Sequence, residues 1–122
     1  MPTQEKIKDI VLSIDKDSVA GSDGFSSVFF QKCWDFINND IHEAVRDFFC
    51  GTPMPRSFKA TTIVLIPKVE SPQTWSDFTP ISLCNVTNKI LCKLLYKKLS
   101  LSLPNLISPA QSGFVTGRLI SI

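Results

Sequence analysis

The stretch TTIVLIPKVESPQTWSDFTPISLC, residues 61–84, contains the segments that decide the fold class. Residues 61–67 form a continuous run of mostly β-branched side chains, which is typical of a strand buried on both faces. Residues 78–83 are a second strand candidate, and Pro80 places it at a sheet edge or at a bulge. Two prolines frame the intervening loop, so we expect an antiparallel pair. Trp75, in that loop, is expected to pack onto the pair, with stacking on a nucleic-acid base as the alternative.

The residues before this stretch predict three helices. Thr3 and Ser26 are N-cap candidates for the first two. Asp40, followed by Glu43, resembles the capping box of a third, and we expect Asn38-Asn39 to separate it from the second. Their apolar faces recur at helical spacing, and comprise Ile7, Ile10, Val11 and Ile14, then Phe29, Phe30, Cys33, Trp34 and Ile37, then Ile41, Ala44, Val45, Phe48 and Phe49. Gly51 is the expected C-terminal stop.

The residues after the stretch predict a long leucine-rich helix from Asn85, with lysines at every fourth position along another face. Beyond Pro104 we expect a short helix over 110–114 and a strand approach over 115–122. An isolated strand pair is marginally stable. We therefore expect the second helix and the leucine face of the long helix to cover the pair. The predicted fold class is α+β, with a helical part, residues 1–55, before a hairpin-and-helix part, residues 56–122.

Composition indicates a single small globular domain. The chain has 122 residues, of which 43% are apolar and 20% charged. No apolar run approaches the ~20 residues of a membrane span, and the first residues lack the apolar core of a signal peptide. We therefore expect an intracellular protein, nuclear or cytoplasmic, with reduced thiols. The four cysteines match no zinc spacing. Three of them lie among apolar neighbours, and we interpret them as core-filling or neutral thiols.

The modest net charge of +2 conceals an asymmetry between the two parts of the chain. Residues 1–55 hold five bases and nine acids, whereas residues 56–122 hold eight bases and two acids. Such a division indicates a cationic part that faces a polyanion. The alternative is that the lysines form a solvated face and the acids only complement helix N-termini.

The residues contain no recognisable catalytic or metal centre. The acidic loop at residues 15–24 fails as an EF-hand, because Val19 and Ala20 stand where an oxygen ligand and a glycine are required. His42 has no nucleophile-activating neighbour at a suitable spacing. In the cationic part only Glu70 and Asp77 could hold a pair of metal ions. We expect no catalytic residue, no metal site and no cofactor.

Four stretches carry a resemblance that spans nearly the whole chain: AGSDGF (20–25), IVLIPKVESPQTWSDF (63–78), PISLCNVTNKI (80–90) and QSGFVTGRLI (111–120). In order and spacing they resemble the N-terminal part of the reverse transcriptase domain of non-LTR, LINE-type retrotransposons, particularly the plant elements. The resemblance implies a right-hand polymerase fold. Residues 1–55 would be its helical N-terminal extension, and residues 56–122 its fingers hairpin, helices and the entrance to the palm.

The resemblance also implies roles for two residues. Lys68 matches the lysine that lies near the incoming nucleotide and template in this family. Thr79 stands where the family usually has an arginine that grips the triphosphate; a threonine hydroxyl supplies neither the charge nor the fork of a guanidinium. The family's catalytic aspartates, which hold two Mg²⁺, follow later in such domains. This sequence is therefore expected to be a truncated reverse transcriptase fragment that is inactive alone.

Two alternatives to that function stay open. The chain could be a small non-catalytic nucleic-acid-binding module, or a translated relic without a selected role. As a binding module it would contact phosphates through Lys59, Lys68, Lys89, Lys93, Lys97 and Arg118. The expected partners are an RNA or DNA template–primer, bound weakly, and a palm segment that the chain lacks, with no membrane.

Overall fold

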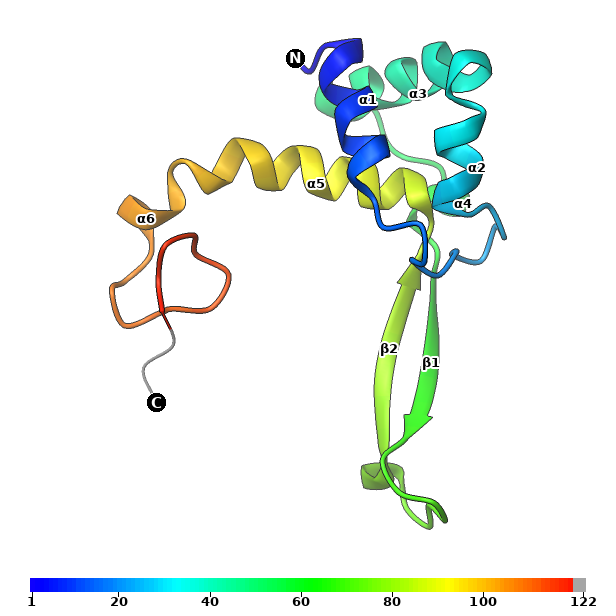
Figure 1. Ribbon diagram of the computed structural model, residues 1–122, viewed down its shortest axis with the longest axis vertical. Coiled ribbons are helices and arrows are strands. Elements are labelled where there is room, and N and C mark those ends of the chain that lie inside the picture. The colour runs from blue at the N-terminus through cyan, green and yellow to red at the C-terminus, as the bar shows by residue number, and fades with distance from the viewer. Residues whose placement is uncertain (120–122) are drawn as a thin grey trace.

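The computed structural model describes residues 1–119 and consists of a helical block from which a long β-hairpin projects (Figure 1). The α+β class expected from the sequence is confirmed. The helices are α1 (Gln4–Ser13), α2 (Ser27–Lys32), α3 (Trp34–Phe49), α4 (Arg56–Lys59), α5 (Val86–Ser100) and α6 (Leu103–Leu106). The strands are β1 (Thr61–Pro67) and β2 (Phe78–Cys84), with the 3₁₀ turn η1 (Trp75–Asp77) between them. None of the helices within residues 1–119 is long and apolar enough to cross a membrane.

The two predicted N-caps are confirmed. The Thr3 hydroxyl accepts a hydrogen bond from the Lys6 amide at 3.3 Å, and the Ser26 hydroxyl accepts one from the Phe29 amide at 3.2 Å. Each side chain thereby satisfies one of the amides that the first turn leaves unpaired. The starts of α1 and α2 therefore follow from local sequence chemistry.

The predicted boundary between the second and third helices is wrong. α3 runs without a break through Asn38-Asn39, and the interruption lies earlier, at Cys33. The Asn38 amide donates to the backbone carbonyls of Trp34 and Asp35 at 3.1 and 3.0 Å, so the side chain is satisfied along the helix. Asp40 consequently lies inside α3 rather than capping it. The expected stop is confirmed, because Gly51 follows α3 with a φ of 84°.

The helices α1, α2 and α3 and the first half of α5 form the helical block. The hydrophobic core lies between them. Its centre consists of Ile7, Ile10 and Ile90, each completely buried. Phe30, Trp34, Val45 and Leu94 extend the same cluster. The apolar faces predicted for the helices thus pack mainly against one another.

The hairpin is a two-stranded antiparallel sheet whose register pairs Thr61 with Cys84 at its base and Pro67 with Phe78 at its outer end. The strand pair is confirmed, and Pro80 lies on an edge, as both strands of such a sheet do. The predicted burial of the first strand on both faces is wrong, since every residue of β1 is exposed. The expected helical cover is also wrong, because the hairpin projects away from the helices (Figure 1), whose buried side chains pack against one another.

The segment after α5 differs from the expectation. Residues 110–114 form turns rather than a helix, and a short α6 precedes them, with Pro104 near its start. Residues 115–119 contain no strand, and the remainder of the expected strand approach, 120–122, lies outside the described residues. The cysteines are not core-filling: Cys50 and Cys92 are exposed, and the other two are half-buried.

Candidate nucleic-acid interface

The outer end of the hairpin brings together the two residues that the resemblance singled out. Thr79 pairs directly with Ile66, and Lys68 extends the ladder by donating its backbone amide to the Asp77 carbonyl at 2.7 Å. Directly opposed residues share a face of a sheet, as do residues two apart along a strand. Lys68 and Thr79 are therefore diagonal neighbours on one face, with Cα atoms roughly 7–8 Å apart.

Both side chains are available to a ligand. Lys68 and Thr79 are exposed, and the Lys68 ammonium donates to the Ser76 carbonyl at 3.1 Å. That bond uses one of the three donors of the ammonium group. The remaining donors can reach a phosphate oxygen while the first holds the side chain near the turn.

The loop at the outer end is fixed by a capping box. The Asp77 carboxylate accepts the backbone amides of Gln73 and Thr74, both at 2.9 Å, and also the Thr74 hydroxyl at 3.2 Å. The hydrogen bond from the Gln73 amide, followed by that from Thr74, holds the pKa of the Asp77 carboxyl below its usual range. Asp77 therefore stays ionised at neutral pH and orders the turn beside Lys68.

Trp75 extends from this ordered turn into solvent. Its ring contacts that of Phe78, with centroids 6.4 Å apart and planes tilted by 47°. Even so, 82% of the Trp75 surface is exposed. The expected packing onto the hairpin is thus only partial, and an open aromatic face lies at the same end as Lys68. Such a face can stack on a nucleic-acid base.

The base of the hairpin is tied to the loop before α2 by Asn85, a residue that the sequence analysis did not single out for this contact. Its side-chain oxygen accepts the Asp23 amide at 3.3 Å, and its side-chain amide donates to the Ser57 carbonyl at 2.9 Å. Gly21 lies so close that a Cβ there would be 2.2 Å from the Asn85 oxygen. Two of the quoted motifs, 20–25 and 80–90, thus meet in space. The sequence signal for this contact was Gly21, because any other residue would bring a Cβ too close to Asn85.

The predicted phosphate-binding cations do not lie on one face. The Lys89 ammonium donates to the Ser18 hydroxyl at 2.8 Å and to the Val19 carbonyl at 2.7 Å, and Lys93 donates to the Ser13 hydroxyl at 3.4 Å. These bonds direct both side chains toward the helical block. A phosphate at either lysine would have to compete with them.

The other three cations are dispersed. Lys59, at the end of α4, and Lys97, on the outer half of α5, are exposed. The Arg118 guanidinium donates to four backbone carbonyls, those of Pro104, Ile107, Ser108 and Gln111. Arg118 thereby organises the turns after α6. The phosphate-contact roles of all these residues stay predictions.

The sequence of this chain is similar to part of a known transposon protein. Over 100 residues, 82% of the chain, the sequence is 32% identical to the "Transposon TX1 uncharacterized 149 kDa protein" of Xenopus laevis. The chain spans only 8% of the length of the frog protein. No protein-family model matches the chain.

The described part of the chain does not bring together the ligands of a metal centre. Within residues 1–119, no group of three His, Cys, Asp or Glu side chains is placed to hold an ion. The Asp77 carboxylate, whose pKa is lowered, already accepts hydrogen bonds from two backbone amides. This carboxylate is thus satisfied within the turn.

Proposed function

We propose that residues 1–122 are the N-terminal part of a reverse transcriptase of the non-LTR, LINE-type class, similar to those of plants, with the fingers hairpin in residues 56–122. In this role the hairpin contacts the phosphates of a template–primer or an incoming nucleotide. The observation that carries the proposal is the placement of Lys68 and Thr79 on one exposed face at the outer end of the hairpin. The similarity to a transposon protein supports the same origin.

The physical chemistry of the hairpin suits this role. The strands project away from the helical block (Figure 1), so the lysine at their outer end is surrounded by solvent rather than by the core. An ammonium group acts there as a point charge for phosphate. Trp75 adds a stacking surface at the same end. The resulting contacts depend on backbone and base faces, as expected for binding without sequence preference.

Phosphoryl transfer is not assigned to these residues. Polymerases of this class use two Mg²⁺ held by aspartates, and the described residues offer no site that fits those ions. The proposed contribution of this chain is therefore binding of RNA or DNA, inside the cell, with chemistry supplied by a palm segment.

The test is the salt dependence of binding to a fluorescently labelled single-stranded RNA, measured by anisotropy. Affinity should fall with rising salt. In a plot of the logarithm of the association constant against the logarithm of the salt concentration, the slope should be about −0.7 for each phosphate contacted. Lys68→Ala should weaken binding and reduce the magnitude of the slope by about one contact. Lys16→Ala, an exposed lysine in the acidic half, is the matched control and should leave both unchanged. Affinity that is independent of salt, or equal losses for the two variants, would contradict the proposal.

A further inference from the structure

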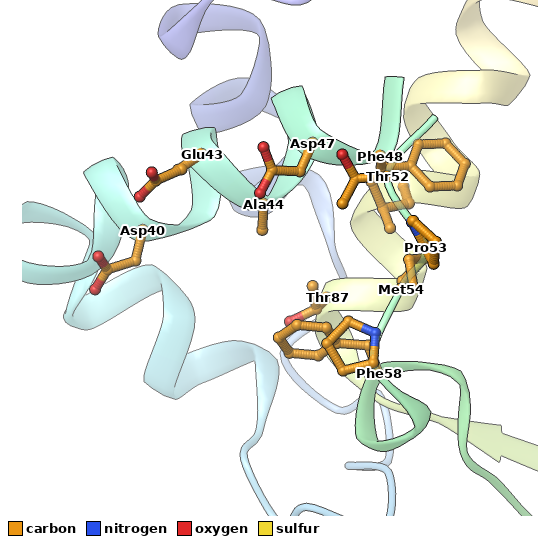
Figure 2. Close-up of a pocket in the computed structure, with 12 residues that line it drawn as sticks. Asp40, Glu43, Ala44, Asp47, Phe48, Thr52, Pro53, Met54, Phe58 and Thr87 are labelled. Atoms are coloured by element: carbon orange, nitrogen blue, oxygen red, sulfur yellow. The ribbon is translucent and has the colours of Figure 1, made fainter. Parts of the chain in front are cut away.

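Two features of the described chain are not used by the proposed function. One is a groove of about 330 Å³ between α3, the segment before α4, and α5, with an apolar floor and with Asp40, Glu43 and Asp47 along one side (Figure 2). Its lining does not identify an occupant. The other is the free edge of β1, whose unpaired backbone groups are complementary to those of another extended strand.

The odd-numbered residues of β1 present their backbone groups at this free edge. In the register of the hairpin, the Lys68 amide donates to the Asp77 carbonyl, so Lys68 directs its backbone toward the opposite strand. Successive residues of a strand direct their N–H and C=O groups alternately toward and away from that neighbour. Thr61, Ile63 and Leu65 therefore direct theirs outward. Within residues 1–119, no further strand pairs with this edge.

The free edge of β2 is interrupted, whereas that of β1 is not. Pro80 is opposite Leu65, so its nitrogen lies at the outward edge of β2 and has no proton to donate. The Phe78 amide, at the end of the same edge, is already bonded to the Trp75 carbonyl. On β1 the only proline is Pro67, at the last position of the strand. Proline protects an edge strand from pairing, and β2 has this protection along its middle while β1 lacks it.

The side chains of β1 also lack the features that keep an edge strand from pairing. The strand contains no charged residue, and it pairs with β2 over 61–67 without a bulge. Ile63 and Leu65 are 68% and 43% exposed. The hairpin projects from the helical block (Figure 1), and every residue of β1 is exposed. An uncharged, apolar and uncovered edge of this kind is a template for strand addition.

We propose that two copies of the chain associate through their β1 edges, which pair antiparallel around a two-fold axis at Val64. The occupant has to be an extended strand with an open edge, apolar side chains and no charge. Within residues 1–119, β1 itself meets these requirements, whereas β2 contains Pro80. Ile63 of each copy is then opposite Leu65 of the other, and their outward N–H and C=O groups exchange hydrogen bonds in both directions.

This pairing joins two isolated hairpins, each of two strands, into one larger sheet. A larger sheet is more stable than an isolated strand pair, which is marginal in water. The edges of the larger sheet are the two copies of β2, each interrupted by Pro80. Association therefore closes at a dimer. The proposal does not depend on the RNA-binding role of the hairpin end.

The first experiment is sedimentation velocity of the full chain over a range of concentrations, without nucleic acid. A single strand pair is a small interface, so we expect a weak, reversible dimer that forms at high chain concentration. Its dissociation constant should change little with salt, because the contacts are backbone hydrogen bonds and apolar side chains. A chain that stays monomeric at every concentration, or one that forms an open series of larger species, overturns the proposal.

Two proline substitutions identify the edge. Leu65→Pro removes an outward N–H from β1 without removing a hydrogen bond of the hairpin itself. Ser82→Pro is the matched control, because Ser82 is opposite Ile63 and its N–H lies at the outward edge of β2. The first should raise the dissociation constant at least about tenfold, and the second should leave it within about twofold. Equal effects of the two substitutions overturn the assignment to β1.

Charge exchange at Leu65 tests the same pairing with every backbone N–H in place. Around the proposed axis the two copies of this residue are diagonal neighbours on one face of the sheet. Leu65→Lys and Leu65→Glu should therefore each be monomeric alone, because like charges are brought together. An equimolar mixture of the two should dimerise. Dimers of either variant alone, or a mixture that does not associate, overturn the pairing whatever the outcome of the RNA measurements.

Discussion

The helical block and the hairpin of this chain are stabilised in different ways. In the block, fully buried side chains such as Ile10 and Ile90 pack between four helices. In the hairpin, every side chain of β1 is exposed, and order comes from the backbone ladder and the capped turn. Stability is therefore concentrated in one region, and exposed binding groups in the other. Separating the two leaves the hairpin side chains free to contact a ligand without disturbing the core.

Replacing one isoleucine by alanine in each region should give the largest difference in the free energy of unfolding. Ile10→Ala removes a side chain that is 0% exposed and should lower the free energy of unfolding by about 2–5 kcal/mol. Ile63→Ala, at a position 68% exposed on β1, should change it by less than about 0.5 kcal/mol. Denaturant titration followed by circular dichroism measures both. Similar losses for the two variants would show that the hairpin shares a core with the block.

The junction between the regions can be tested at Gly21. An alanine Cβ there would lie 2.2 Å from the Asn85 side-chain oxygen and 2.6 Å from the Cys84 carbonyl carbon. The backbone at Cys84 is part of β2 and cannot move aside freely. Gly21→Ala should therefore cost about 1–3 kcal/mol of unfolding free energy, as other overpacked sites do.

The matched control for the junction is Gly113→Ala, where the nearest atom is the end of the Gln111 side chain at 3.3 Å. A small movement of that side chain relieves the contact, so we expect almost no change in the same denaturant titration. If Gly21→Ala were as neutral as the control, the contact between the two motifs would not hold the hairpin base.

The smallest expected effect is local, at the capped turn. The pKa of Asp77 is lowered below its ordinary value of 3.8 by the Gln73 and Thr74 amides. Asp77 therefore stabilises the turn above pH 3.8, and this stabilisation is lost as pH falls through the lowered pKa of the folded state. In NMR spectra the Gln73 and Thr74 amide signals should shift together over that acidic range. Asp77→Asn should abolish the titration, and a midpoint above 3.8 would contradict the capping geometry.

Local chemistry in the sequence correctly predicted the starts of the first two helices and the strand pair. Thr3 and Ser26 cap the helices for a reason that involves only the following three residues. The β-branched run at 61–67 likewise favours a strand irrespective of its surroundings. The position of Lys68 just beyond that strand followed from the same local pattern.

What the sequence could not predict depends on contacts between distant residues. A β-branched run does not specify whether anything covers it, so the exposure of β1 was missed. The role of Asn85 depends on partners more than 25 residues away. The common face of Lys68 and Thr79 required the strand register. The engagement of Lys89 with the loop after α1 likewise depends on how α5 packs.

The most direct test of the central claim, that the outer end of the hairpin contacts phosphates, compares two arginine substitutions. Thr79→Arg places a guanidinium beside Lys68, and Thr62→Arg places one on the same face near the hairpin base. We predict that the first raises affinity for labelled single-stranded RNA and steepens its salt dependence by about one phosphate contact, whereas the second has a clearly smaller effect. Equal gains from both, or no gain at position 79, would contradict the account.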